Sequence, residues 1–309
     1  MLNEFKSLIT LFQSYLTWIL DISPGEMAAC ILFLFFALFV ILESCCPREQ
    51  RFSERLRQSY RANIELFAFN SIVVSLLSIP SLLILAEQYS DKGLLNYITN
   101  PLGKAVVAFL ALDLLLYIWH KASHSFECLW MFHKVHHTDP YLNVSTAFRA
   151  HFLEILIINF IKAMLIVVLG IQEALVLANE MVITLFTMLH HTNISFRGER
   201  LLGQLVITPY LHRVHHSVKR HEHDRNYGSV LSLWDRLFGT LAELKPEEIG
   251  IKGSVPQDLV SLVKCGFIMT DRSPAQPDHD VLIPEAACCK AGRRGFYLND
   301  WQEAKNEID

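Results

Sequence analysis

The sequence is poor in charged residues and shows no cysteine pattern. Only 19% of its 309 residues are charged and 52% are hydrophobic, a balance that indicates a membrane protein. The 7 cysteines are odd in number and lack CxxC spacing, so we interpret them as reduced. No charged segment followed by a small-residue cleavage site opens the chain, and we expect no removable signal peptide.

Two further absences exclude classes of function. No basic tract interleaved with aromatic residues occurs, which argues against nucleic acid as a partner. The HExxH motif is also missing, so a zinc peptidase is not expected. The net charge of -4 says nothing about other partners.

The histidines are strongly clustered. Of the 14 in the chain, only His279 lies outside residues 120–223. Residues three or four apart share one face of a helix, so closely spaced histidines aim several imidazoles at one point. The sets are His120-xxx-His124, His133-xx-His136-His137, His190-His191 and His212-xx-His215-His216. A single metal ion cannot use so many imidazoles, and the pattern therefore predicts a centre with two metals.

The ligand type narrows the chemistry. Neutral imidazole suits iron, zinc, copper and nickel, and no thiolate accompanies any of the sets. A histidine-rich site with few carboxylates at a membrane face points to redox-active iron and O2 chemistry on a lipid. Cleavage of an unactivated C–H bond requires such a metal in a water-poor pocket near acyl chains.

Apolar runs alternate with polar connections along the first 190 residues. About 20 apolar residues are needed to cross a bilayer, so the broken run Leu8–Ile22 is expected to lie at the interface. The Leu66–Ala86 run contains Pro80, which a membrane helix can tolerate. The last two runs should form a helical hairpin. The predicted spans are Met27–Leu42, Leu66–Ala86, Ala105–Trp119, Phe152–Leu169 and Ala174–Leu189.

The charges predict the sidedness of these spans. The connection after the first span carries five arginines within residues 48–61 against Glu49 and Glu54, which places it in the cytoplasm by the positive-inside rule. An even number of crossings separates this loop from the histidine sets, so they should face the cytoplasm too. From about residue 245 we expect a cytoplasmic tail with little independent fold.

Asp113 is an ionisable residue inside a predicted span. Such a residue is costly in a membrane and usually has a partner. Steps of three or four residues lead from it to Tyr117, His120 and His124 on one helical stripe. The carboxylate would then orient a ligand imidazole or help to move a proton; the alternative is an Asp satisfied by interfacial water.

The histidine sets, in this order and spacing, resemble the fatty acid hydroxylase/sterol desaturase superfamily of membrane-bound di-iron enzymes, and within it the bacterial sterol desaturase-like proteins. Each motif alone is weak, whereas their order over roughly residues 105–240 is highly specific. The motifs that extend the resemblance are Arg149-x-His151-xx-Glu154, His191-x-Asn193, Asp224-x-Asn226-Tyr227-Gly228 and the run from Leu233 to Thr240.

The resemblance implies an all-α, polytopic membrane bundle with a cytoplasmic, histidine-rich di-metal centre. It implies that Asp224, Asn226 and Tyr227 hold the last histidine set in place and, with Asp113, form the catalytic candidates. His221 and His223 lie in a linker without a fixed histidine in the family and are expected to be solvated. The implied metal ligands are His120, His124, His133, His136, His137, His151, His190, His191, His212, His215 and His216.

The implied function is that of an oxidoreductase which hydroxylates or desaturates a lipid, either a fatty acyl, sterol or related chain, with O2 and external electrons. The cofactors would be two iron ions, with zinc as the expected replacement on overexpression. No haem-binding cytochrome domain is fused to the chain, so a separate donor protein or reduced cofactor would supply electrons. The alternative is a membrane metal transporter or metal-handling protein, which would need polar residues continuing across the bilayer.

The resemblance also suggests the organisation and location of the protein. We predict an N-terminal membrane region over residues 1–104, a catalytic domain over 105–242 and a cytoplasmic C-terminal tail over 243–309. The expected location is the bacterial inner membrane, crossed several times, with the active site on the cytoplasmic face. The motifs do not distinguish hydroxylation from desaturation, and they leave the oligomeric state undetermined.

Overall fold

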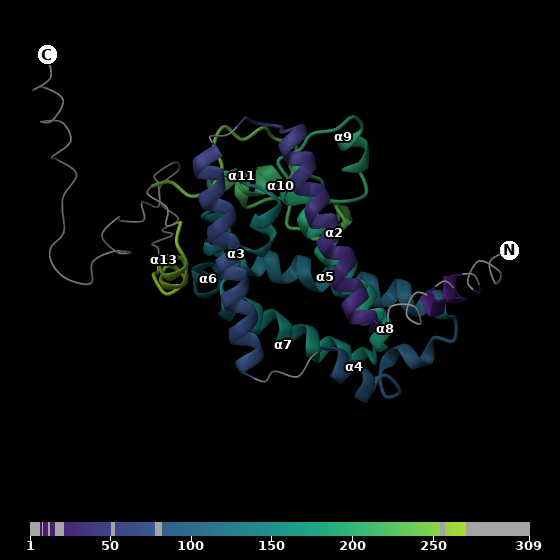
Figure 1. The fold of residues 1–309 in the computed structure, drawn as a ribbon. Helices are drawn as coiled ribbons and strands as arrows, with labels where there is room; N and C mark the ends of the chain where they lie inside the picture. Colours follow the sequence, from purple (N-terminus) through teal and green to yellow (C-terminus); the bar gives the residue numbers. More distant parts are fainter. Residues whose placement is uncertain are drawn as a thin grey trace, which may run out of the picture.

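The computed structural model describes residues 7, 9–11, 13–15, 22–50, 53–77, 82–253 and 257–269. Within these ranges the regular structure is helical and contains only isolated β-bridges, so the predicted all-α class is confirmed. The expected interfacial helix Leu8–Ile22 lies largely outside them. The elements (Figure 1) are α2 Pro24–Cys45, α3 Ser53–Leu76, α4 Leu82–Tyr89, η1 Leu94–Tyr97, α5 Pro101–Ser125, α6 Glu127–His137, η2 Val144–Phe148, α7 Phe152–Leu169, α8 Glu173–His191, α9 Glu199–Leu202, α10 Pro209–His215, α11 Arg220–His223, α12 Leu233–Leu237 and α13 Leu259–Cys265.

Among the described residues, four helices, α2, α5, α7 and α8, are long and apolar enough to cross a membrane. The 22 residues of α2 extend about 33 Å at 1.5 Å per residue, against about 30 Å for the hydrocarbon core. Its start is set by a capping box, in which Ser23 and Glu26 each accept the other's backbone N–H. Asn100 caps α5 in a similar way, by accepting from the first amides of the helix. The chain is an integral membrane protein.

The span predicted over Leu66–Ala86 is wrong. α3 starts in the polar segment at Ser53 and ends at Leu76, and the 8-residue α4 follows as a separate helix. Pro80 lies outside the described residues, but a proline lacks a backbone N–H and disfavours helix in the residue before it. The apolar run therefore does not make a single helix, and α4 packs instead against α7 and α8.

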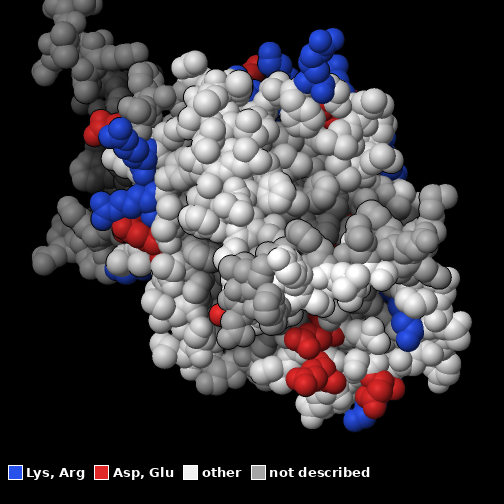
Figure 2. Space-filling view, turned by 45° about the vertical axis from the view of Figure 1, so that its right-hand side comes forward, with Lys and Arg blue, Asp and Glu red and all other residues white. Residues whose placement is uncertain are grey.

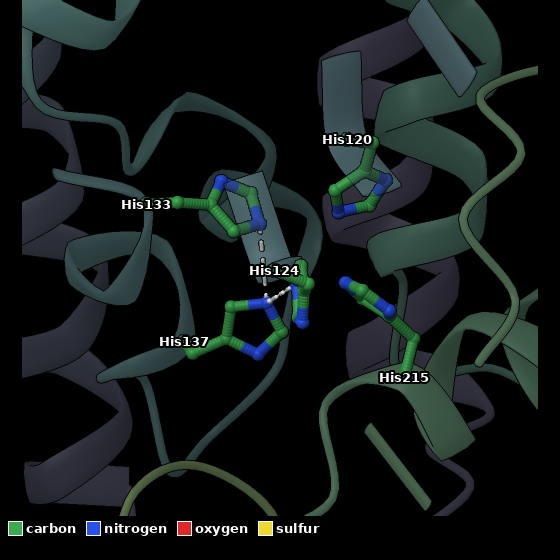
Figure 3. Close-up of side chains that lie close together, drawn as sticks. All are labelled: His120, His124, His133, His137 and His215. Carbon is green, nitrogen blue, oxygen red and sulfur yellow. Dashed lines mark hydrogen bonds between the residues drawn. The ribbon is translucent and has the colours of Figure 1, made fainter. Parts of the chain in front are cut away.

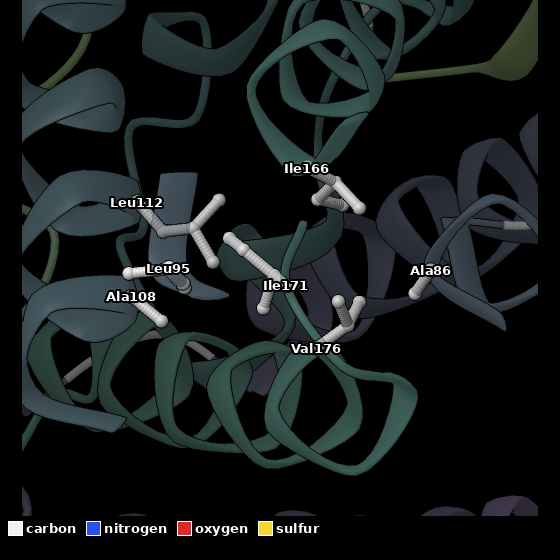
Figure 4. Packing of buried hydrophobic residues seen from close by; sticks show 7 residues of the cluster. All are labelled: Ala86, Leu95, Ala108, Leu112, Ile166, Ile171 and Val176. Carbon is white, nitrogen blue, oxygen red and sulfur yellow. The ribbon is translucent and has the colours of Figure 1, made fainter. Parts of the chain in front are cut away.

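A hydrophobic cluster joins α4, η1, α5, α7 and α8 around the connection between α7 and α8 (Figure 4). Gly170 ends α7 with a φ of +66°, and a Cβ on Gly93 would overlap the Gly170 backbone, so this close approach needs glycine at both positions. α7 ends and α8 begins at this cluster. The start of α7 and the end of α8 therefore both lie at the other end of the helical hairpin, away from the cluster. The buried members of the cluster are Ala86, Leu95, Ala108, Leu112, Ile166, Ile171 and Val176.

Part of the predicted C-terminal tail is packed against the membrane region. Asp258 caps α13 by accepting from the Ser261 amide at 3.0 Å. Leu262 and Cys265 of α13 are fully buried against α3 and α6, which α13 flanks in Figure 1. The sequence had predicted little independent fold after residue 245. A single seven-residue helix such as α13 has too few apolar positions to show a clear helical period.

Candidate metal centre

The histidine sets lie at the ends of helices that converge on one region. α5 carries two histidines one turn apart near its C-terminus, and α6 carries three histidines in its last two turns. α8 ends in a histidine pair, and the seven-residue α10 presents the last set. The 3.6-residue period of the helix explains why each set points in one direction.

Five of the histidines form the first group. The group comprises His120, His124, His133, His137 and His215, whose ligand nitrogens all lie within 4.8 Å of one another. His137 Nε2 lies 3.1 Å from His124 Nε2 and 3.3 Å from His133 Nε2. Figure 3 shows the five rings around a common centre, with His133 and His137 facing His120 and His215 across it.

Four more histidines form the second group, His136, His191, His212 and His216. His191 Nε2 lies 3.0 Å from Nε2 of both His136 and His212, and His212 Nε2 lies 3.1 Å from His216 Nε2. The two groups are neighbours, because the rings of His137 and His216 stack with their centroids 4.6 Å apart.

The spacing within the second group fits a bound cation. His136 Nδ1 lies 3.0 Å from the Arg149 carbonyl, and His191 Nδ1 lies 2.6 Å from the Thr187 carbonyl. A carbonyl oxygen only accepts, so both Nδ1 atoms carry the hydrogen and both Nε2 atoms of the neutral rings present bare lone pairs. Two facing lone pairs repel. An ion about 2.1 Å from each nitrogen, as for imidazole on zinc, would hold two of them about 3.0 Å apart at right angles.

In the first group, Nδ1 of four histidines likewise points away from the other rings to a hydrogen-bond acceptor. Nδ1 of His120 and of His215 each donates to a backbone carbonyl, that of Tyr227 and of Arg225, at 2.8 Å. His133 Nδ1 contacts Glu154 Oε1 at 2.6 Å and His124 Nδ1 contacts Asp224 Oδ1 at 3.1 Å. Such partners fix the tautomer and turn Nε2 inward, as in characterised metal sites.

Burial keeps these rings neutral. Desolvation lowers the pKa of His136 to about 3. Burial, followed by the proximity of other histidines, lowers the pKa of His137, His212 and His216 well below the ordinary value, and burial does the same for His215. Neutral imidazole is the form that binds metal, so the donor set fits a metal centre at neutral pH.

A buried polar network supports His136 from behind. The fully buried Arg149 guanidinium donates to the Val135 carbonyl, to Thr138 Oγ1 and, at 2.9 Å, to Asn63 Oδ1 of α3. Burial alone would raise the pKa of Asp139, but the charge of Arg149 and several hydrogen bonds lower it below its ordinary value. The Arg149 carbonyl that accepts from His136 is therefore held rigidly.

Two predicted ligands do not join either group. His151 caps α7, because its Nδ1 accepts from the Leu153 amide at 3.3 Å and its Nε2 donates to the Val263 carbonyl at 3.2 Å. Both of its nitrogens are used, so its assignment as a ligand is corrected to a link between α7 and α13. His190 is buried with its ring centroid 3.9 Å from that of His212, but it lies outside both groups.

Asp113 has a different role from the one predicted. Its carboxylate accepts from the Val230 amide at 3.0 Å, the Leu231 amide at 3.2 Å and Trp234 Nε1 at 2.8 Å. It therefore fixes the backbone before α12 and contacts no histidine directly. Asp113 does lie on the same helix as His120 and His124, as predicted. Its carboxylate, however, accepts hydrogen bonds from a segment more than a hundred residues later in the sequence.

The other three catalytic candidates surround the centre. Asp224 contacts His124, as given above. Tyr227 offers its carbonyl to His120 and places its ring 5.2 Å from that of His124. Asn226, with a φ of 54°, clamps the chain by donating to the Leu211 and Ala242 carbonyls and accepting from the Ala242 amide.

Sequence reasoning missed three residues around the site. Glu154 stands in a quoted motif, but its contact with His133 was not foreseen. Glu43 at the end of α2 accepts from the Val144 amide at 2.8 Å and the Asn193 amide at 2.7 Å, and no local pattern announces it. His223, expected to be solvated, stacks on Trp130 with centroids 5.6 Å apart and forms a possible donor group with His124 and Asp224.

One known family matches part of the chain. Residues 105–240, from α5 to just beyond α12, match the family model described as fatty acid hydroxylase. The match covers less than half of the 309 residues and is consistent with the fatty acid hydroxylase/sterol desaturase superfamily, which confirms the resemblance drawn from the motifs. No solved structure gives a match.

Curated relatives agree with this family. The chain is 28% identical over 193 residues to an ornithine lipid hydroxylase of Rhizobium tropici, covering 61% of this chain and 58% of that protein. It is 30% identical over 150 residues to the alkylglycerol monooxygenase of Caenorhabditis elegans, covering 47% of this chain and 28% of that protein. For the Homo sapiens alkylglycerol monooxygenase the values are 32% over 133 residues, 43% and 29%. The chain thus spans less than two thirds of the length of these relatives.

Proposed function

We propose that this protein is a membrane-bound di-iron oxidoreductase that hydroxylates or desaturates a lipid with O2 and electrons from a separate donor. The observation that carries the proposal is the pair of all-histidine groups near the ends of helices, with ring nitrogens facing one another at about 3 Å. The relatives reported above are named as a hydroxylase and as monooxygenases that act on lipids.

The chain's own residues have defined roles in this proposal. Bound iron would supply the activation of O2. The nine histidines hold the metals, and the carbonyls of Tyr227, Arg225, Arg149 and Thr187 fix the ring orientations. Eight of the nine histidines are buried and His120 is half-buried, so bulk water is kept from the reacting atoms.

The substrate we propose is the hydrocarbon chain of a membrane lipid, whether fatty acyl, sterol or related. A buried centre beside apolar helices can be reached from the bilayer, which a water-soluble substrate would not require. The same observation opposes the metal-transport alternative. Lys162 and Glu180, the ionisable pair between α7 and α8, neutralise each other at 2.9 Å and Asp113 is fully engaged, so they offer no polar path to the opposite face.

We place the centre on the cytoplasmic side of a bacterial inner membrane. Figure 2 shows a broad face almost without charge, with more Lys and Arg than Asp and Glu above it and to one side, and with most of the Asp and Glu below beside a few Lys and Arg. Arg48 follows α2 and its amide donates to the Asn193 carbonyl at 2.7 Å, two residues after the end of the histidine helix α8. The basic edge thus coincides with the histidine ends, as the positive-inside rule requires for a cytoplasmic site.

The family match supports a catalytic domain over residues 105–242, between an N-terminal membrane region, 1–104, and a C-terminal region, 243–309. Glu43, Ser59 and Asn63 of the N-terminal region contact the catalytic segment. We therefore propose that residues 1–104 are needed to hold the centre in shape. The electron donor, whether a protein or a reduced cofactor, would approach from the cytoplasm.

The decisive experiment feeds 18O2 to cells that express the wild-type protein or His133→Ala and compares their extracted lipids. A hydroxylase gives a lipid carrying labelled oxygen with the wild type only, and a desaturase gives an unlabelled lipid two mass units lighter. Protein-independent lipid profiles in the sterol, fatty acyl, ether-lipid and carotenoid classes would refute the proposal. Metal analysis of the purified wild type should give about two irons per chain, with zinc replacing iron on strong overexpression.

A further inference from the structure

Apolar side chains are exposed on α9, on the segment after it and on α12. Ser232 donates its amide to the Leu205 carbonyl at 3.0 Å, which makes these segments neighbours. We call the following residues the α9–α12 patch: Leu201, Leu205, Leu233, Leu237 and Phe238, which are exposed by 75%, 69%, 47%, 65% and 49%. A continuous apolar surface of this kind marks an interaction site.

The α12 part of the patch lies against the middle of a membrane-spanning helix. Trp234 of α12 donates to Asp113, the central residue of the 25 in α5, and Phe238 stacks on Tyr117 with centroids 5.3 Å apart. Half the length of α5 is about 18 Å, so these contacts lie deep within the bilayer thickness if α5 spans it. The α12 part of the patch thus lies beside a helix that is long and apolar enough to cross the membrane.

Backbone N–H groups in the irregular segment before α12 have hydrogen-bond acceptors within the protein. Backbone N–H groups in the bilayer must be satisfied within the protein. Asp113 accepts the Val230 and Leu231 amides, and Asp235 accepts the Tyr227 and Gly228 amides at 2.8 Å. Two buried carboxylates therefore supply the partners that water would supply outside the membrane.

The patch also lies near the first histidine group. Phe238 stacks on Tyr117, Tyr117 lies 6.2 Å from Tyr227 between ring centroids, and Tyr227 lies 5.6 Å from His120. A chain of ring contacts through Tyr117 and Tyr227 thus links Phe238 to a ring of the first group. Arg200 and Arg236 are exposed next to members of the patch.

We propose that the α9–α12 patch is immersed in the bilayer and packed by lipid acyl chains, and that it is the side from which a lipid chain reaches the first histidine group. The second half of this statement rests on the function proposed above. The first half does not, since it concerns only where the membrane touches the protein.

The test uses the full chain in lipid nanodiscs that contain a phospholipid with a diazirine on its acyl chain. After photolysis, peptide mass spectrometry should find Leu233, Leu237 and Phe238 labelled as strongly as Ile118, an exposed residue of α5. Leu244 is the matched control, because it is 45% exposed but lines a charged pocket of about 530 Å³ with Arg213 and Lys245. Labelling of the patch at the level of Leu244, or chain-to-chain cross-links through it, would overturn the proposal.

A pair of variants tests the second half. Leu237→Arg should lose lipid product formation while keeping the metal content of the wild type, and Leu244→Arg should keep both. Product formation unchanged in Leu237→Arg would reject the patch as the entrance. A wild-type protein that is labelled at the patch yet modifies no lipid would refute the proposed function and leave the membrane contact standing.

Discussion

The two histidine groups use the same ligand type but are supported differently. In the first group, Glu154 and Asp224 place carboxylates behind His133 and His124. In the second group, His136 and His191 have only backbone carbonyls behind them. A carboxylate behind an imidazole raises its basicity and stabilises positive charge on the metal. If each group binds a metal, as proposed, we expect the first group to be better suited to a higher charge.

The groups also differ in what holds them in place. The carboxylates of the first group are side chains that a single substitution can neutralise. The carbonyls of the second group cannot be removed in this way, and their positions depend on the network around Arg149 and on the helix α8. The first group should therefore be sensitive to charge and the second to packing.

The largest effect should come from removing one ligand of each group. His133→Ala and His191→Ala should each lower the metal content by about half and abolish lipid product formation, because each variant breaks one group. The measurement is elemental analysis of protein purified without added metal. His221→Ala is the control, since that side chain is 66% exposed and belongs to neither group, and it should change nothing. Loss of all metal in both variants would mean that the groups do not bind independently.

The next effect is on folding. Arg149→Met leaves Asp139 as an uncompensated buried charge and should lower the free energy of unfolding by about 3–5 kcal/mol. Arg61→Met removes only an exposed pair with Glu65, in which the arginine side chain is 79% exposed, and should have little effect. Thermal unfolding in detergent compares the two. Equal stability of the two variants would contradict the support assigned to the second group.

Glu154→Gln should separate the groups by charge. The substitution keeps the shape but removes the anion behind His133, so metal affinity of the first group should fall about 10–100-fold while the second is unchanged. Asp224→Asn should do less, because Asp224 is 29% exposed and is shared with Arg220. Competition with a chelator measures both. A fall in the affinity of the second group alone would reverse the comparison.

The pH dependence of the metal-free protein has a definite sign. The folded pKa of His136 is about 3, below the ordinary value of 6.5, and that of His212 is also lowered. Below pH 6.5 the unfolded chain therefore binds more protons at these histidines than the folded chain does. The free energy of unfolding consequently falls as the pH falls toward 3. Denaturant titrations of metal-free protein between pH 8 and pH 5 should show this loss. Stability that rises on acidification would exclude neutral buried histidines.

The smallest effect on the centre is expected from Asp113→Asn. Because Asp113 holds the Val230 and Leu231 amides and touches no histidine, metal content should remain that of the wild type. Hydrogen exchange at those two amides should accelerate as their acceptor weakens. A loss of metal comparable to that of His133→Ala would restore the role first predicted for Asp113.

The sequence alone determined the helical class, the histidine sets and the family resemblance, because these depend on local quantities. Hydropathy over a span, the 3.6-residue period and the order of short motifs can each be read without contacts. The structure gathers nine of the eleven histidines predicted as ligands into two groups. They failed at Leu66–Ala86, where a hydropathy run was taken for one helix.

The tertiary structure decided how the histidines are divided and what stands behind each. His136 and His137 are adjacent in sequence but belong to different groups, because neighbours on a helix point about 100° apart and meet different partners. Asp113 shares a helical stripe with His120 yet binds a segment near residue 230, and Glu43 joins the site from over a hundred residues away. Long-range contacts leave no local pattern in the chain, because they depend on which surfaces meet once the helices have packed.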